Sequence, residues 1–320
     1  MTVQSRQIVS RIVSSAFCAL ATAGVLAAAV GPVKLSPAEA ARVVQEIQKD
    51  RAATEAWLKS EATSYLATVD RLDFAGKRTL SVGRAATNDL RIDDPGVEPH
   101  HLRVTVEGDR FQVERVDAAA TFAVESTAGK FENVASGTTT LGPGSVKIGR
   151  LLLRLSHQGF PGIIVFDPKS PRFALYKGLE YFAPDLSYRY ELPLTPNPKP
   201  ETVVILSTRG NQRRATRVGW FEFTVGGQVA KLEAVRLLEP GVGENDISVF
   251  FRDATSGKES YELGRYVDVK KLPSGQFLLD FNAAYNPACA YSVHYNCPIP
   301  PKANVLPIAI RAGERDSHYY

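Results

Sequence analysis

Short apolar runs with a period of two fill most of the chain from Thr79 to Asp280, and they constrain its fold more than any other feature. Alternating or continuous apolar residues make up LSVGR, DLRID, HLRVTV, RFQVERV and FAVES in the first half, and VVILS, GWFEFTV, DISVFFRD and QFLLDF in the second. Glycine, proline, asparagine and aspartate separate them. Alternation puts every second side chain on one face of a strand, and the short spacings are typical of hairpins. The chain is therefore expected to be mainly β, with antiparallel sheets.

The length of 320 residues allows two domains. The pattern predicts a signal peptide or N-terminal anchor over residues 1–40 and an amphipathic helical segment over 41–70. An antiparallel β-sandwich is expected over 71–160 and a second antiparallel β domain over 161–320. The proline-rich stretch 193–201 is incompatible with a helix or a central strand, so it is interpreted as a joint.

The N-terminal forty residues have the layout of a secretory signal segment. Arg6 and Arg11 precede a stretch without charge, Ile12–Val33, that is rich in alanine, leucine and valine. Cleavage is expected after Ala29 or before Ala41, and an uncleaved membrane anchor is the alternative, because the run is just long enough to span a bilayer. Both readings export the rest of the chain, to the periplasm or the outside, and membrane contact is expected only without cleavage.

The segment from Pro37 to Ser64 predicts one helix. Ser36 and Pro37 suit a cap and a first turn, and apolar residues recur at helical spacing. The polar face mixes acidic and basic residues, whereas a helix on a membrane surface has a strongly basic polar face. The helix is therefore expected to pack onto the domain that follows it.

The charge gives no reason to expect a nucleic-acid partner. The formal charge is +4, and half of it lies in the first forty residues. Nucleic-acid binding requires clustered lysine or arginine on one face. The one such cluster is Ser207–Arg217, with four arginines, which is interpreted as a solvated hairpin loop.

The first β region carries several residues that belong to one known pattern. They are Gly83-Arg84, Asn88 to Asp93, Val97, His101 and Leu141 to Gly149. In this pattern residues 78–156 resemble the forkhead-associated (FHA) domain, which implies a sandwich whose loops hold phosphothreonine. Glu98 followed by Pro99 stands where that family has its phosphate-binding serine, and a carboxylate repels phosphate. The resemblance therefore implies an FHA-like structural module, and a protein-interaction scaffold remains an alternative function.

The C-terminal sequence is the most specific part of the chain. The signature segments are FRDATSGKESYELGRYVDV, LDFNAAYNPACAYSVHYNCPIPP and NVLPIAIRAGE. They resemble the family called domain of unknown function 1684, and the resemblance extends from about residue 42 to 315. It implies an FHA-like first half and no established activity.

Polar and aromatic side chains in the signature segments suggest two arrangements. One is a network of arginine–carboxylate pairs between strands, and the other is a pocket at the mouth of a barrel or sandwich, where arginines bind a carboxylate or phosphate. For the pocket the predicted function is non-catalytic binding of a small anionic ligand or envelope component. Its candidate residues are Arg252, Arg265, Asp280, Asn282, Tyr285 and Arg311.

Two cysteines lie close together in the signature. In an exported protein Cys289 and Cys297 are expected to form a disulfide, worth roughly 2.5 kcal/mol for so short a loop. The alternative is a zinc site from Cys289, His294 and Cys297, with Asp280 or Glu314 as a further ligand, in a hydrolase-type enzyme. G-x-S-x-G and H-E-x-x-H motifs are absent, so no catalytic residue is predicted and an enzymatic function stays open.

Overall fold

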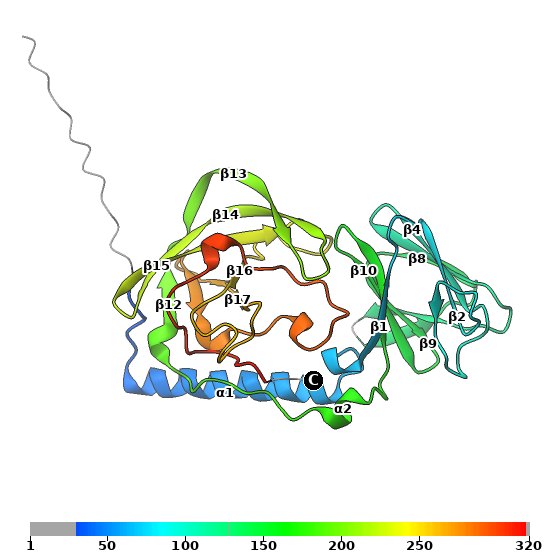
Figure 1. The fold of residues 1–320 in the computed structure, drawn as a ribbon, viewed down its shortest axis with the longest axis horizontal. Coiled ribbons are helices and arrows are strands. Elements are labelled where there is room, and N and C mark those ends of the chain that lie inside the picture. Colours follow the sequence, from blue (N-terminus) through cyan, green and yellow to red (C-terminus); the bar gives the residue numbers. More distant parts are fainter. Residues whose placement is uncertain (1–29, 128, 318–320) are drawn as a thin grey trace, which may run out of the picture.

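The computed structural model describes residues 30–127 and 129–317. Two mainly β bodies lie side by side, with helix α1 (Pro37–Ser60) running along the C-terminal body (Figure 1). Residues 1–29 of the expected signal segment 1–40, including Arg6 and Arg11, lie outside the described residues. Within the described ranges no helix is long and apolar enough to cross a membrane.

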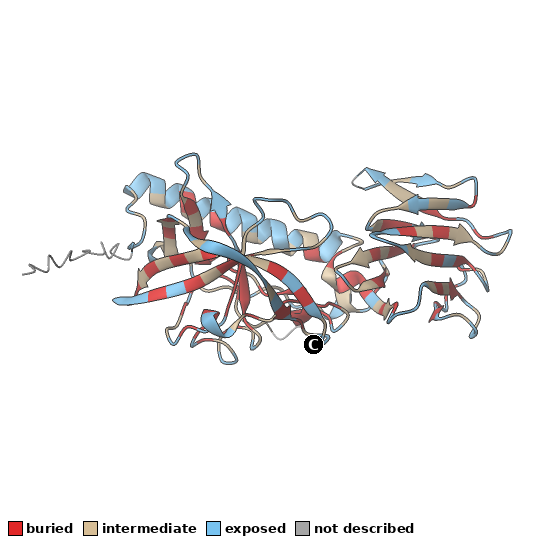
Figure 2. Cartoon of the chain, turned by 90° about the horizontal axis from the view of Figure 1, so that it is seen from above, coloured by how far each residue is buried: buried red, intermediate tan, exposed pale blue. Residues whose placement is uncertain are grey.

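The first body is the expected β-sandwich. One sheet consists of β1 (Thr68–Asp73), β11 (Pro161–Phe166), β10 (Leu151–His157), β9 (Gly144–Ile148), β6 (Ala123–Thr127) and β7 (Lys130–Asn133), in this order. The other consists of β3 (Leu90–Arg91), β2 (Thr79–Gly83), β4 (Leu102–Glu107), β5 (Arg110–Arg115) and β8 (Thr138–Leu141). All pairs are antiparallel except β2 with β3. Buried and exposed residues alternate along the strands, as the sequence predicts (Figure 2).

Strand β11 extends the sandwich beyond the boundary expected at residue 160. It pairs with both β1 and β10, so residues 161–166 belong to a sheet of the sandwich and not to the second β domain expected from residue 161. Ile163 and Val165 enter the sandwich core, whereas Ile164 and Phe166 enter a second core shared with the C-terminal body. Strand β11 is apolar on both faces because one face packs in the sandwich core and the other packs in the core shared with the C-terminal body.

The C-terminal body contains two antiparallel sheets. The larger consists of β13 (Thr195–Leu206), β14 (Gln212–Val225), β15 (Gln228–Leu237), β16 (Ser248–Phe251) and β17 (Arg265–Asp268). The smaller consists of β12 (Arg189–Leu192), β19 (Phe277–Asp280) and β18 (Lys270–Lys271). Their common core is aromatic and aliphatic, with Tyr190, Phe221, Phe223, Phe251 and Phe281 among its buried residues.

The proline-rich stretch begins strand β13 at the edge of the larger sheet. Proline lacks a backbone N–H donor and is tolerated on an edge strand. The pairing with β14 is interrupted between Pro196 and Glu201. The prediction that this stretch is not a central strand is confirmed. It is part of an edge strand of the larger sheet, and not only a joint.

The predicted helix is present and begins with a capping box. The Ser36 hydroxyl accepts a hydrogen bond from the amide of Glu39, whose carboxylate accepts one from the amide of Ser36. Helix α1 thus begins at Pro37, inside the segment 1–40. The expectation that it packs onto the following sandwich is wrong. The C-terminal end of helix α1 packs on the C-terminal body, where Leu58 forms an apolar cluster with Ala290 and Tyr291.

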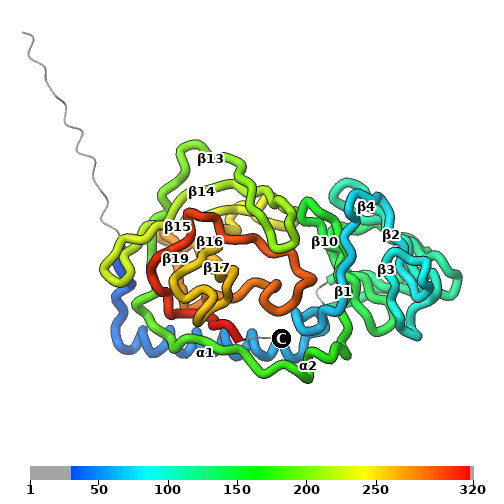
Figure 3. The backbone as a smooth tube through the Cα atoms, viewed as in Figure 1, coloured from blue at the N-terminus to red at the C-terminus, as the bar shows by residue number. Residues whose placement is uncertain are grey.

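The remaining helical pieces are short. They are α2 (Arg172–Leu175) and the 3₁₀ turns η1 (Tyr65–Ala67), η2 (Leu186–Tyr188), η3 (Phe281–Ala283), η4 (Ala288–Ala290) and η5 (Lys302–Asn304). The segment after β19, orange in Figure 3, runs from the C-terminal body toward the sandwich and back. There Tyr295 and Cys297 pack into the core shared by both bodies. The most specific part of the sequence therefore lies at the domain junction.

Candidate functional site

Arg265 is part of a buried network. It is 0% exposed, and its guanidinium donates to the carbonyls of Ile310 (2.8 Å) and Ala312 and to a carboxylate oxygen of Asp253 (3.4 Å). The guanidinium carbon also lies 5.2 Å from the centre of the Phe251 ring. Burial lowers the pKa of Arg265, and the nearby Asp253 opposes this. Arg265 holds the C-terminal segment against the sheet and does not line any of the hollows described below.

Asp280 and Asn282 brace the backbone of a neighbouring loop. Asp280 is paired with Arg189 and accepts from the Asn282 side-chain amide at 2.9 Å. The Asn282 side chain also exchanges two hydrogen bonds with the backbone of Asp185, each 2.8 Å long. Both side chains are buried. Their contacts fit the network arrangement.

The side chains of the other three candidate residues make no hydrogen bond with the Arg265 guanidinium. Arg311 is exposed and pairs with Glu259 at 2.9 Å. Arg252 is also exposed. The Tyr285 hydroxyl donates to Asp268 at 3.1 Å. The six predicted residues therefore do not converge on one pocket, and their ligand-binding role stays a prediction.

The two cysteines are adjacent, as a disulfide requires. Cys289 lies in η4, and its amide nitrogen is 3.2 Å from Sγ of Cys297. The structure holds both as buried thiols rather than as a disulfide, so the predicted bond stays a prediction. Among residues 30–127 and 129–317, no three histidine, cysteine, aspartate or glutamate side chains cluster as metal ligands. His294 therefore does not join the cysteines in the alternative zinc site.

The four arginines of residues 207–217 do not form the expected solvated loop. The turn is short, and β14 already begins at Gln212. Arg213 is buried on this strand and makes two hydrogen bonds of 2.5 Å to the carboxylate of Glu239. The expectation failed because strand β14 continues through the charged residues. Arg213 faces inward on this strand, and the carboxylate of Glu239 neutralises its buried charge.

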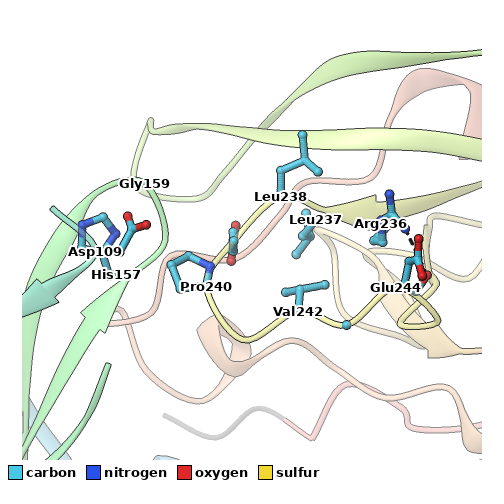
Figure 4. Close-up of a pocket in the computed structure, with 11 residues that line it drawn as sticks. Asp109, His157, Gly159, Arg236, Leu237, Leu238, Pro240, Val242 and Glu244 are labelled. Atoms are coloured by element: carbon cyan, nitrogen blue, oxygen red, sulfur yellow. Dashed lines mark hydrogen bonds between the residues drawn. The ribbon is translucent and has the colours of Figure 1, made fainter. Parts of the chain in front are cut away.

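A groove of about 550 Å³ lies on the outer side of the domain junction (Figure 4). Asp109 and His157 come from the sandwich at one end of the groove, and Val242 and Glu244 come from the loop after β15, with Pro240 between the two sets. Arg236 in the same groove donates to the backbone carbonyl of Glu244 at 3.2 Å. This groove combines carboxylates with apolar surface, which does not favour an anion.

A second hollow, the helix groove, lies between α1 and the C-terminal body and has a volume of about 660 Å³. Its two arginines are already engaged: Arg51 donates to the carbonyls of Phe182 and Asn282, and Arg189 is paired with Asp280. Its lining also includes five carboxylates and several aromatic rings. These are Glu46, Asp50, Asp268, Asp280 and Glu314, with Trp57, Tyr65, Tyr181, Tyr285 and Tyr291. This groove contains three of the six predicted residues, but its carboxylates disfavour an anionic ligand.

The third hollow, the inter-domain cleft, has a volume of about 300 Å³ and the opposite charge. It is bounded by β10 and β11 of the sandwich, by the larger sheet of the C-terminal body and by residues 287–298. Its lining contains three arginines, Arg71, Arg154 and Arg213, and no aspartate or glutamate. Of the six predicted residues, Tyr285 alone lines it.

Arg154 reaches the cleft because of its position in β10. Leu153 and Leu155 on either side enter the sandwich core, so Arg154 faces the C-terminal body together with Leu152. Its guanidinium carbon lies 4.9 Å from the centre of the Phe166 ring. It makes no hydrogen bond or ion pair with any residue that the structure describes. It is a half-buried cation without a counter-charge.

The other two arginines are paired, but Arg71 keeps one donor without an acceptor. Arg71 donates from Nε to Asp73 at 2.7 Å and from Nη1 to the His294 carbonyl at 3.3 Å. Its Nη2 is buried and has no acceptor among the described residues. The side-chain amide nitrogen of Asn296 is also buried and has no acceptor among the described residues. The backbone carbonyl of Asn296 accepts a hydrogen bond from Arg213 at 3.1 Å. Arg71 and Asn296 are both more than nine-tenths buried, at 7% and 4% exposed.

Four tyrosines form part of the cleft wall: Tyr65, Tyr266, Tyr285 and Tyr295. The hydroxyl of Tyr295 is hydrogen-bonded to Thr68 at 2.7 Å, and that of Tyr266 donates to the carbonyl of Pro298. The ring of Tyr65 packs edge-on against Tyr295, with 5.1 Å between centroids. Burial raises the pKa of Tyr65, so its hydroxyl stays protonated well above neutral pH.

Sequence reasoning did not identify Arg71, Arg154 or Asn296 as site residues. One signal was present for Arg154, which interrupts the apolar run Leu151–Leu155 within a predicted strand. An arginine at such a position faces a buried surface, where a charge normally needs a partner. No comparable signal marks Arg71 or Asn296, because their positions depend on how the two bodies meet.

Comparison with known proteins identifies both bodies. The family described as protein of unknown function (DUF1684) matches residues 174–315, and the FHA domain matches residues 80–133. A solution NMR structure of an uncharacterized protein of Haloarcula marismortui is 39% identical. That similarity covers 44% of this chain and 77% of the other, with a TM-score of 0.36. No match was found among curated proteins.

Proposed function

The chain belongs to the DUF1684 family with an FHA domain before the family domain, and we propose that it is a non-catalytic binder of a small anionic ligand in the inter-domain cleft. The ligand would touch both bodies, since Arg154 belongs to the sandwich and Asn296 to the signature segment. Export to the periplasm or the outside is part of the same proposal. An anionic component of the cell envelope is then a suitable ligand.

One observation carries this proposal: three side chains that line the cleft have hydrogen-bond donors without acceptors. Arg154 makes no hydrogen bond or ion pair with the described residues, and Arg71 Nη2 and Asn296 Nδ2 are buried without acceptors. A buried donor left unpaired costs about 1–3 kcal/mol, and more when it is charged. An anion with several oxygens would satisfy such donors, and the planar guanidinium suits a carboxylate or phosphate.

The size and lining of the cleft restrict the ligand further. A volume of about 300 Å³ is at the lower end of the range for ligand sites. The rings of Tyr65, Phe250 and Tyr266 offer apolar surface beside the arginines. A small carboxylate or phosphate with a short or planar apolar body therefore fits better than an extended polymer.

A second candidate function is protein interaction through the FHA domain, which is a protein-interaction module. One observation favours it: Arg84 is exposed at the loop end of the sandwich, and among the described residues its side chain donates a single hydrogen bond, from Nε to the Val97 carbonyl at 3.2 Å. Beside it, His101 is buried and joins the amide of Glu98 to the carbonyl of Thr121, both at 2.9 Å. These contacts stabilise the loops whether or not a partner binds.

The test is ligand-induced thermal stabilisation and calorimetry with three probes: inorganic phosphate, phenyl phosphate and benzoate. We expect at least one probe to raise the melting temperature of the reduced protein, and Arg154→Met to abolish the increase. The matched control is Arg311→Met, which removes an exposed arginine outside the cleft and should leave the increase unchanged. Equal loss in both variants would attribute the effect to general surface charge and would refute a site in the cleft.

A further inference from the structure

The loop that closes one side of the inter-domain cleft begins and ends in a cysteine. Both Cys289 and Cys297 are 7% exposed, and Cys297 itself lines the cleft. The amide of Cys289 donates to Sγ of Cys297 at 3.2 Å. We infer that these two thiols form a reversible disulfide that regulates anion binding in the cleft. The binding part of this inference rests on the proposed function, whereas disulfide formation does not.

The electrostatics of the pair suit thiol–disulfide exchange. A hydrogen bond from the Cys297 thiol lowers the pKa of Cys289, and the Tyr261 hydroxyl, 3.8 Å from its sulfur, acts in the same direction. The hydrogen bond to Cys289 raises the pKa of Cys297. Cys289 is therefore the first of the two to lose its proton and form the thiolate, which is the nucleophilic form of cysteine.

The oxidant is a small-molecule disulfide. The thiolate of one cysteine attacks a sulfur of that disulfide, so a mixed disulfide forms and one thiolate leaves. The second cysteine, as its thiolate, then attacks the sulfur of the first, and the Cys289–Cys297 bond forms as the other small thiolate leaves. The protein loses two electrons and two protons, and the small disulfide gains them as two thiols.

The disulfide would act on the cleft through the loop between the cysteines. The backbone carbonyls of His294 and Asn296 accept hydrogen bonds from Arg71 and Arg213, so this loop positions two of the three cleft arginines. Tyr295 and Asn296 also line the cleft themselves. Between η4 and Cys297 the loop contains no strand or further helix. A covalent link between its ends would hold these groups in the binding arrangement, so the oxidised form is expected to bind the anion more tightly.

The experiment is an equilibrium titration of the full chain with mixtures of reduced and oxidised dithiothreitol. Remaining thiols are alkylated and counted by intact mass, with and without saturating inorganic phosphate. We expect a disulfide that raises the melting temperature and binds phosphate about fivefold or more tightly than the thiol form. Linkage then requires phosphate to raise the equilibrium constant for oxidation by the same factor.

Two controls separate the parts of the inference. Arg154→Met should still form the disulfide, but phosphate should no longer shift its equilibrium. Cys289→Ser should bind phosphate like the reduced wild type under all conditions. The main comparison uses wild-type protein in two redox states, so it does not depend on the folding of a variant.

The outcomes are distinguishable. Two alkylated thiols at every dithiothreitol ratio would overturn the inference. A disulfide whose equilibrium ignores phosphate, in a protein that binds phosphate, would overturn the regulatory role. A stabilising disulfide in a protein that binds no anion in either state would overturn the proposed function and leave disulfide formation supported.

Discussion

Replacing Arg154 by methionine should change stability little and anion binding strongly. In the structure the guanidinium interacts with the Phe166 ring at 4.9 Å and makes no ion pair or hydrogen bond with the described residues. A cation–π contact at a partly exposed site is worth about 0.5–1 kcal/mol, and a methionine sulfur near the same ring recovers about 0.3–1.5 kcal/mol. The substitution also removes one positive charge near two others. The free energy of unfolding should therefore change by less than about 1 kcal/mol.

The effect on binding should be larger, because a charged donor would be lost. A hydrogen bond to a charged group contributes about 1.5–3 kcal/mol, which corresponds to a loss of affinity of roughly 10- to 150-fold. Urea unfolding measures the first quantity, and isothermal titration with the best of the three probes measures the second. Both measurements use the reduced protein, so that the state of the cysteines is fixed.

The reasoning would be refuted by the opposite pattern. A loss of more than about 2 kcal/mol of stability with unchanged anion affinity would show that Arg154 is a structural residue with an interaction that the static contacts do not reveal. Arg154→Lys gives a further comparison, because lysine keeps the charge but lacks the planar fork. Its affinity should lie between those of the wild type and Arg154→Met.

Three further predictions concern the framework around the site. Arg265→Met should destabilise the protein by about 3–5 kcal/mol in urea unfolding, because it leaves the carboxylate of Asp253 buried without its cation; a loss below about 1 kcal/mol would contradict the network. Gly83→Ala should cost about 1–3 kcal/mol, since a Cβ there would lie 2.3 Å from the Pro99 carbonyl oxygen; unchanged stability would show that the loop yields. Hydrogen bonds to Lys77 and to the amide of Ser81 lower the pKa of Asp89 to about 2 from 3.8. The stabilisation by Asp89 is therefore present above pH 3.8 and lost as the pH falls toward about 2. Asp89→Asn should flatten the acid limb of the stability curve slightly, because this exposed carboxylate is screened by solvent; an unchanged acid limb would count against the shift.

The sequence predicted features that depend on neighbouring residues. Alternation in β4, where Leu102 and Val104 are buried and Arg103 is exposed, follows from the two-residue period of a strand alone. The cap at Ser36 is similarly local. The FHA-like and DUF1684 resemblances were also correct, because they depend on residues within single segments.

Predictions that depend on long-range packing were less successful. Arg265 looks like a ligand-binding arginine in the sequence, but carbonyls of residues 310–314, which return to it from the C-terminal end, enclose it completely. Helix α1 was expected on the domain next to it in the sequence, yet it packs on the C-terminal body. Amphipathicity shows that a helix has a buried face but does not identify its partner.

Strand composition, turn positions and family membership were thus determined by the sequence itself, since each is encoded by residues a few positions apart. The tertiary structure alone decided where the binding cleft lies. Arg71, Arg154 and Asn296 are separated by up to 225 positions, and they meet only because β1, β10 and the signature segment come together at the junction of the two bodies. The lack of a counter-charge for Arg154 is likewise a property of that packing, because pairing depends on distance in space and not on position in the chain.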